Sequence, residues 1–195
     1  KPFFLHICYT APHYPLHAKP SDVAKYRGRF MKGWEQMRRD RWARQHQMGL
    51  VASHWTLTDT DSRSYDWDSA DHEFEDHRMA VYAAMIDSMD QNIGRLRAAL
   101  QEAGEAENTL ILFMQDNGGC AEGLGRRARG KNPNPKRSET KNLAAMKPTD
   151  LQRSMIPQKT RDGRPTLMGR NVMPGPDGTY IAYGRGWANV SDTPF

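Results

Sequence analysis

Residues 78–119, RMAVYAAMIDSMDQNIGRLRAALQEAGEAENTLILFMQDNGG, decide the fold that the sequence predicts. In the first part of this stretch, apolar residues recur every three or four positions, as one face of a helix requires. They are Tyr82, Met85, Met89, Ile93, Leu96 and Leu100. Gly104 is a typical helix terminator, so the pattern predicts a helix over about 78–103. Thr109–Met114 is short and continuously apolar, which is typical of a strand buried on both faces of a parallel sheet.

A second apolar run, Phe3–Tyr9, opens the chain, and Pro12 and Pro15 follow it closely. We interpret this run as another buried strand. A strand, a long helix and a strand in this order predict an α/β fold, with a largely parallel sheet flanked by helices in layers. Thr179–Tyr183 has the composition of one more short strand.

Other segments have simpler interpretations. Cys8 and His6 lie within the first predicted strand, and we expect both to be buried core residues. Residues 34–48 are basic, with interspersed tryptophan and methionine, and predict a helix. Residues 56–77 show no clear period and predict a loop-rich segment. Its histidines, His72 and His77, stand among acidic residues, and we interpret them as part of a solvated loop rather than a metal site.

Length and charge limit the remaining possibilities. A chain of 195 residues suits one domain, and its formal charge is +5. No apolar run approaches the roughly 20 residues that cross a bilayer, so we expect no membrane span. Residues 123–147 carry many arginines and lysines against the single acid Glu139, which predicts a basic loop or insertion. Because Lys1 leads directly into a predicted strand, we interpret residues 1–195 as an internal piece of a longer protein.

Polar residues that could carry chemistry follow the second predicted strand. Asp116 and Asn117 offer a carboxylate and an amide oxygen, which are hard ligands suited to Ca²⁺ or Mg²⁺. Gly118 and Gly119 allow a sharp change of direction and a close approach to a site. The alternative is an ordinary tight turn, because Asn-Gly is the favoured pair of a type I′ turn.

His13 follows the first predicted strand and stands between two prolines. In that position it could donate to an anion or act as a general acid. The alternative is a surface histidine with no role. Both candidate sites follow the carboxyl ends of predicted strands, where open parallel sheets bind ligands.

The order of these motifs resembles the sulfatase family of the alkaline-phosphatase-like superfamily. The run through Thr10-Ala11-Pro12-His13-Tyr14-Pro15-Leu16 is similar to that family's A-P-H-x-P-L loop. Residues 79–94 resemble the helix that precedes the family's metal-binding strand. Residues 108–119 resemble its N-T-hydrophobic-S-D-N-G motif, with Gln115 in place of serine, and Trp187–Phe195 resembles a segment of bacterial arylsulfatase-like members.

The resemblance implies hydrolysis of a sulfate ester, on an aryl compound or a carbohydrate. Family members use a formylglycine made from a C/S-x-P-x-R motif, and a divalent cation, usually Ca²⁺ and possibly Mg²⁺. It also implies that Asp116 and Asn117 are two cation ligands, and that His13 contacts the sulfate and helps to protonate the leaving oxygen. Family members of bacteria are often exported, so a periplasmic or secreted parent is expected.

The sequence also departs from the family pattern. No C/S-x-P-x-R motif occurs in the 195 residues. We expect that motif, an Asp-Asp pair and a Lys-x-His upstream of Lys1, and a late active-site lysine beyond Phe195. Residues 1–195 are therefore interpreted as a partial sulfatase catalytic domain with an incomplete sheet, inactive by itself.

Two alternatives stay open. One is a phosphodiester or phosphonate ester hydrolase of the same superfamily, since the same cation and histidine suit phosphoryl transfer. The other is a non-catalytic fragment that binds polyanions through its basic run. We expect no nucleic acid partner, because that run lacks aromatic residues on which bases could stack.

Overall fold

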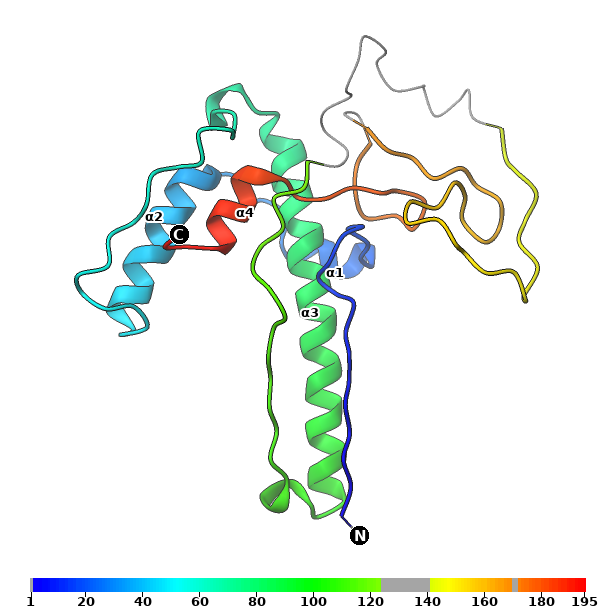
Figure 1. Ribbon diagram of the computed structural model, residues 1–195, viewed down its shortest axis with the longest axis horizontal. Helices are drawn as coiled ribbons and strands as arrows, with labels where there is room; N and C mark the ends of the chain where they lie inside the picture. Colours follow the sequence, from blue (N-terminus) through cyan, green and yellow to red (C-terminus); the bar gives the residue numbers. More distant parts are fainter. Residues whose placement is uncertain (1, 124–140, 170–171) are drawn as a thin grey trace.

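The computed structural model describes residues 2–123, 141–169 and 172–195. Its dominant element is α3, His72–Glu102, a single long helix at the centre of Figure 1. The shorter elements in chain order are α1 (Pro20–Ala24), α2 (Gly33–Gln47), the 3₁₀ turns η1 (Trp67–Ser69) and η2 (Ala106–Asn108), and α4 (Arg185–Ser191). α1 packs on α3, and α2 packs on α4 beside the first half of α3 (Figure 1).

The predicted central helix is confirmed, and it begins earlier than the apolar pattern indicated. Asp71 caps α3, because its carboxylate accepts a hydrogen bond from the Phe74 amide at 3.1 Å. Gly104 follows the helix with a φ of 70°, as expected for a helix-terminating glycine. The first half of α3 is buried, whereas in the second half Met89 and Ile93 of the predicted stripe are only half-buried.

The two apolar runs, Phe3–Tyr9 and Thr109–Met114, are extended but do not pair into a sheet. Both run alongside α3 in Figure 1, in the direction opposite to the helix. They therefore run in the same direction as each other, which is the arrangement that two parallel strands joined by a crossover helix require. Their expected burial is wrong for this structure, since Phe4 is 91% exposed and Leu110 is 83% exposed.

The physical reason is the absence of neighbouring strands. An extended segment buries its side chains and satisfies its backbone groups only between other strands or under helices. Among the described residues, pairing is limited to isolated bridges, one of which joins Leu167 to Thr179. The predicted short strand Thr179–Tyr183 is thus reduced to a single bridging residue, and the parallel sheet of the predicted α/β fold stays a prediction.

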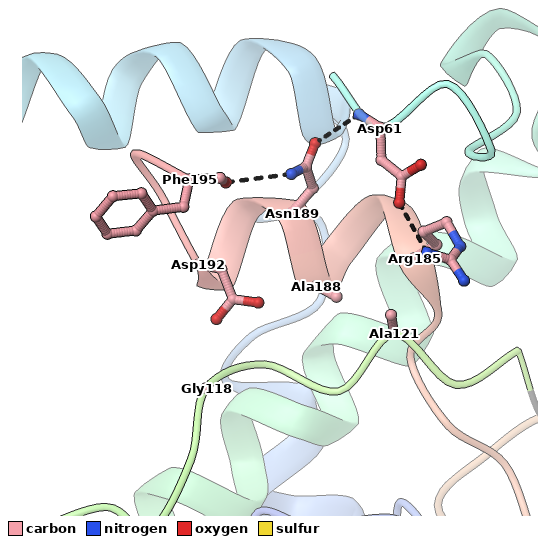
Figure 2. A pocket seen from close by; sticks show the side chains of 8 residues that line it. All are labelled: Asp61, Gly118, Ala121, Arg185, Ala188, Asn189, Asp192 and Phe195. Carbon is pink, nitrogen blue, oxygen red and sulfur yellow. Dashed lines mark hydrogen bonds and ion pairs between the residues drawn. The ribbon is translucent and has the colours of Figure 1, made fainter. Parts of the chain in front are cut away.

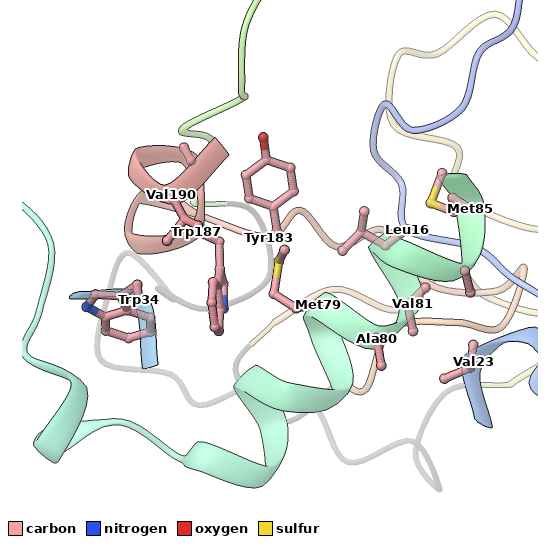
Figure 3. Close-up of a cluster of buried hydrophobic side chains, with 12 residues drawn as sticks. Leu16, Val23, Trp34, Met79, Ala80, Val81, Met85, Tyr183, Trp187 and Val190 are labelled. Atoms are coloured by element: carbon pink, nitrogen blue, oxygen red, sulfur yellow. The ribbon is translucent and has the colours of Figure 1, made fainter. Parts of the chain in front are cut away.

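The core lies between the first half of α3, α2 and α4 (Figure 3). Trp34 of α2 and Trp187 of α4 are almost fully buried, with an edge-to-face contact at 5.6 Å between ring centroids. Met79 and Val81 of α3 and Leu16 complete its centre. The predicted helix over 34–48 is therefore confirmed, and it buries the tryptophan at its start.

A buried polar network ties α3 to the C-terminal segment. Arg78 forms an ion pair with Glu75 at 2.5 Å, with side chains 3% and 0% exposed, and donates to the Ala182 carbonyl at 3.2 Å. The indole of Trp187 donates to Glu75 at 2.9 Å. Asp76 is also buried. The acidic segment expected to be a solvated loop is therefore the start of α3, where Glu75 and Asp76 are buried with internal donors while Asp71 and Glu73 stay exposed.

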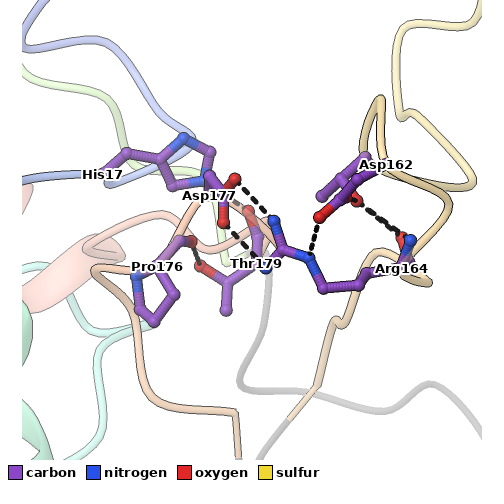
Figure 4. Close-up of polar contacts among 7 residues, drawn as sticks. His17, Asp162, Arg164, Pro176, Asp177 and Thr179 are labelled. Atoms are coloured by element: carbon purple, nitrogen blue, oxygen red, sulfur yellow. Dashed lines mark hydrogen bonds and ion pairs between the residues drawn. The ribbon is translucent and has the colours of Figure 1, made fainter. Parts of the chain in front are cut away.

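Residues 141–169 and 172–183 form an irregular lobe whose turns are joined by ion pairs (Figure 4). Arg164 contacts Asp177 through two parallel hydrogen bonds at 3.1 and 2.9 Å, and donates to Asp162 at 2.7 Å. Hydrogen bonds from Arg164 and Thr160 lower the pKa of Asp162 to about 2. The His17 ring donates to the Thr179 carbonyl at 2.6 Å, which attaches this lobe to the N-terminal segment.

The predicted basic loop over 123–147 falls mostly on residues 124–140, which lie outside the described residues. Of its basic side chains, Lys141 and Lys147 belong to the described part. Within the described ranges, no helix has the length and apolar character needed to span a membrane.

Candidate functional site

His13 lies in the 10–15 loop and is exposed. Its amide donates to the Thr10 carbonyl at 3.0 Å, and its ring Nδ1 donates to the Tyr14 carbonyl at 2.6 Å. Because a carbonyl only accepts, Nδ1 carries the proton. Nε2 therefore has a lone pair in the neutral ring and a second N–H in the imidazolium, so the ring can exchange a proton through Nε2.

Asp116 and Asn117 lie at the start of the 116–120 loop, and both are exposed. The Asn117 amide group donates to the Gly118 carbonyl at 3.0 Å, which leaves its oxygen as the atom suited to a cation. The backbone that follows is fixed from outside the loop. The Gly119 amide donates to the Asp192 carboxylate at 2.6 Å, and the Cys120 amide donates to the Tyr183 hydroxyl at 2.7 Å.

The two glycines of this loop are explained by close approach to α4. A Cβ added at Gly118 would lie 2.6 Å from an Asp192 oxygen, and one at Gly119 would lie 2.8 Å from the Tyr183 hydroxyl. Neither distance leaves room for a side chain. Asn117 and both glycines have negative φ, so the alternative of a type I′ turn, which needs positive φ, does not apply.

The two candidate loops are attached to one segment, residues 180–183. Leu16, directly after the 10–15 loop, donates from its amide to the Ile181 carbonyl at 2.9 Å. The Tyr14 ring contacts the Tyr180 ring edge-on at 5.9 Å, and Tyr183 accepts from the 116–120 loop. The 180–183 segment is buried and is itself fixed through the Ala182 carbonyl.

Two tyrosine hydroxyls beside these loops have raised pKa values. Burial raises the pKa of the Tyr14 hydroxyl, and nearby Glu122 and Cys120 raise it further. Burial likewise raises the pKa of Tyr183, with the neighbouring Tyr82 acting in the same direction. Both hydroxyls therefore stay protonated and neutral at pH 7, as hydrogen-bonding groups rather than charges.

A cavity of about 430 Å³ adjoins the 116–120 loop (Figure 2). Its wall includes Gly118 from that loop, Arg185 from α4 and Asp192 directly after α4. Arg185 forms an ion pair at 2.8 Å with Asp61, which also lines the cavity. Hydrogen bonds from Arg63 and Arg185 hold the pKa of Asp61 well below its usual range. The cavity is therefore lined by the ion pair of Arg185 and Asp61 and, separately, by the Asp192 carboxylate that accepts from the loop.

The chemistry of Asp116 and Asn117 fits a hard divalent cation, because each offers an exposed oxygen. They cannot complete a shell by themselves, since Ca²⁺ takes about 6–8 oxygen ligands. Among the described residues, no three side chains of histidine, cysteine, aspartate or glutamate gather closely enough to bind a metal. The pair thus fits as part of a cation site.

Other residues singled out in the sequence have different environments from those expected. Cys8 is exposed and contacts the His6 ring at 3.4 Å, so the prediction that both are core residues is wrong, because their segment has no sheet around it. His72 stacks on Trp67 and donates to its carbonyl at 2.9 Å. His77 donates to the Pro174 carbonyl at 2.9 Å, and burial lowers its pKa. Both α3 histidines therefore have structural hydrogen bonds.

Sequence reasoning assigned no role to Asp192 or Tyr183, although both contact the 116–120 loop directly. Tyr183 belongs to the predicted strand Thr179–Tyr183, and Asp192 belongs to the segment Trp187–Phe195 that resembles arylsulfatase-like proteins. Both residues therefore lie in segments that the sequence analysis had singled out. Nothing in their local sequence indicates which distant backbone amides they accept from. That information lies in the packing of α4 beside the loop.

Comparison with known proteins identifies the family of the chain. The family model described as Sulfatase matches residues 1–154. An uncharacterized sulfatase of Schizosaccharomyces pombe is 38% identical over 125 residues, which cover 62% of this chain and 22% of the relative. The arylsulfatase of Klebsiella aerogenes is 28% identical over 200 residues, which cover 100% of this chain and 36% of the relative.

A third relative is the multifunctional alkaline phosphatase superfamily protein PehA of Trinickia caryophylli. It is 32% identical over 134 residues, which cover 60% of this chain and 24% of the relative. The chain thus spans about a fifth to a third of the length of these relatives. Since the family model covers most of its residues in one continuous match, this chain belongs to the sulfatase family.

Proposed function

We propose that the protein carrying this chain hydrolyses sulfate esters, with Asp116 and Asn117 as two ligands of a Ca²⁺ ion and His13 as the residue that contacts the sulfate. Family membership supports a hydrolase with an alkaline-phosphatase-like α/β fold. The observation that carries the site assignment is the attachment of both loops to the 180–183 segment. That attachment supports the proposal, because it ties the loop of His13 and the loop of Asp116 and Asn117 to one buried segment.

The chemistry of the described side chains suits this reaction. When bound, the cation would supply positive charge that stabilises the sulfate and a formylglycine nucleophile, for which these 195 residues contain no C/S-x-P-x-R motif. His13 donates from Nδ1 to the Tyr14 carbonyl, which orients Nε2 outward. In the imidazolium form, Nε2 can protonate the departing oxygen. Because the nucleophile motif is missing from the sequence, residues 1–195 alone should not turn over an aryl sulfate.

Substitution of Asp116 in the full-length protein tests the cation assignment. Asp116→Ala should abolish hydrolysis of 4-nitrophenyl sulfate and weaken Ca²⁺ binding measured by calorimetry. Asp90→Ala is the matched control, because Asp90 is also an exposed aspartate but lies in the second half of α3. Normal turnover by Asp116→Ala would remove the assignment.

A leaving-group series tests His13. General acid catalysis contributes about 10²–10⁴-fold, and only where the departing oxygen needs a proton. His13→Gln should therefore lose far more activity on an alkyl sulfate than on 4-nitrophenyl sulfate, whose phenolate departs readily. An equal loss on both substrates would contradict the role in protonation.

Hydrolysis of a phosphodiester or a phosphonate ester is a second candidate function. The likeness to PehA motivates it, because that relative is named a multifunctional protein of the superfamily. Turnover of 4-nitrophenyl sulfate and bis(4-nitrophenyl) phosphate by the same full-length preparation separates the two functions. A preference for the phosphate would replace the sulfatase proposal, while Asp116 and Asn117 would keep their role.

A further inference from the structure

We infer that Asp192 and Tyr183 are positioning residues, which fix the backbone of the 116–120 loop so that Asp116 and Asn117 present their oxygens to the cation. The inference rests on the proposed function and adds to it two residues from the C-terminal segment. Neither is assigned as a ligand or as a group that touches the substrate.

The first observation is the pattern of hydrogen bonds. Two consecutive amides, two and three residues after Asn117, are bonded: that of Gly119 to Asp192 at 2.6 Å and that of Cys120 to Tyr183 at 2.7 Å. The bond to Asp192 is charge-assisted, which makes it shorter and stronger than a neutral bond. Two adjacent fixed amides determine the direction in which the preceding residues leave the loop.

The second observation is steric. The 116–120 loop approaches Asp192 so closely that a Cβ at Gly118 would lie 2.6 Å from the carboxylate. A Cβ at Gly119 would lie 2.9 Å from Ser191 as well as 2.8 Å from the Tyr183 hydroxyl. Figure 2 shows the Asp192 carboxylate directed from the end of α4 toward the Gly118 backbone. The glycines therefore serve this contact, and not a positive φ.

The third observation is that both partners are rigid. Tyr183 belongs to the buried cluster of Figure 3 and is 4% exposed. Its ring packs edge-on against Tyr82 of α3, with 4.8 Å between ring centroids. The Asp192 amide donates to the Ala188 carbonyl at 2.9 Å at the end of α4, which the buried Trp187 anchors in the core. The exposed ligands Asp116 and Asn117 thus depend on a support built from the core. In metal sites, loss of such a supporting group typically lowers affinity about 10–100-fold.

The test measures Ca²⁺ binding to the metal-free full-length protein by calorimetry. Asp192→Ala should weaken binding about tenfold or more. Asp192→Asn, which keeps an oxygen acceptor for the Gly119 amide, should retain most of the affinity. Asp61→Asn is the matched control, because Asp61 lines the same cavity and carries the same charge but contacts Arg63 and Arg185 instead of the loop. It should bind Ca²⁺ as the parent does.

Hydrogen exchange supplies a readout that needs neither metal nor activity. In the metal-free protein, amides 119 and 120 should exchange faster in Asp192→Ala and remain protected in Asp192→Asn. Tyr183→Phe keeps the buried ring and removes only the hydroxyl, so it should accelerate exchange at Cys120 with little change in thermal midpoint. It serves as the second variant if Asp192→Ala perturbs α4.

Each outcome has a defined meaning. If Asp116→Ala weakens Ca²⁺ binding but Asp192→Ala and Tyr183→Phe do not, the positioning role is wrong and the proposed function stands. If Asp192→Asn loses as much affinity as Asp192→Ala, the effect is one of charge and the positioning role is also wrong. If Asp116→Ala binds Ca²⁺ normally, the cation assignment fails, and this inference fails with it.

Discussion

The replacement Arg78→Met should destabilise the protein strongly. The change removes the guanidinium from a pair whose side chains are 3% and 0% exposed, at 2.5 Å from Glu75. The Glu75 carboxylate would then keep neutral donors, the Trp187 indole at 2.9 Å and the Tyr65 hydroxyl, but lose its cation. The Ala182 carbonyl would lose the donor that reaches it at 3.2 Å.

Breaking one partner of a buried pair typically costs about 3–5 kcal/mol, because the remaining charge is left without compensation in a low dielectric. Replacing both partners should cost less. In Glu75→Gln/Arg78→Met, the neutral amide oxygen still accepts from Trp187 and no charge is buried. The double variant should therefore be more stable than Arg78→Met alone, with a coupling free energy within the roughly 0.5–3 kcal/mol seen for residues in contact.

Urea unfolding at pH 7, followed by tryptophan fluorescence, measures these free energies in the protein that carries this chain. Trp34 and Trp187 lie in the core beside the network, so their emission reports its loss. A cost below about 1 kcal/mol for Arg78→Met would refute the reasoning. So would a double variant whose cost equals the sum of the two single costs, because the two side chains would then be independent.

Three further predictions concern single side chains. Gly119→Ala should weaken Ca²⁺ binding about tenfold in a calorimetric titration, because its Cβ would lie 2.8 Å from the Tyr183 hydroxyl. Gly123→Ala is the control and should not weaken binding, because no atom of the described residues lies within 4 Å of its Cβ. An equal effect of both substitutions would contradict the steric argument. Burial lowers the pKa of His77, so stability should fall as the pH drops below 6.5, where the unfolded ring takes up a proton more readily. The thermal midpoint of His77→Gln should therefore fall less steeply with decreasing pH than that of the unsubstituted protein. Trp187→Ala should lower the free energy of unfolding in urea by about 3–5 kcal/mol. A loss of less than about 1 kcal/mol would be inconsistent with the complete burial of Trp187.

The local features of the sequence were sufficient to predict the two longest helices, whereas the short helices α1 and α4 were not predicted. The apolar stripe from Tyr82 to Leu100 predicted α3, and residues 34–48 predicted α2, because a helix satisfies its own backbone and needs only a periodic apolar face. The predicted start of α3 was too late, because the apolar pattern contains no information about the capping residue. The Asp71 carboxylate caps the helix, which begins at His72.

Strand burial could not be predicted in the same way. The composition of Phe3–Tyr9 and Thr109–Met114 indicates strands, and the structure gives both segments an extended backbone running in one direction. Whether an extended segment is buried depends on neighbours far away in the chain, since its hydrogen-bond partners are never its own residues. Cys8 and His6 are exposed for that reason, although their sequence context indicates a core.

The sequence by itself determined the candidate chemistry. Asp116, Asn117 and His13 were identifiable because oxygen ligands and an imidazole are properties of single residues placed after apolar runs. Only the tertiary structure decided what supports them. Asp192 and Tyr183 reach the 116–120 loop from the C-terminal segment, 73 and 63 residues away from their partners. A hydrogen bond between residues so distant in sequence is set by how α4 packs on the core.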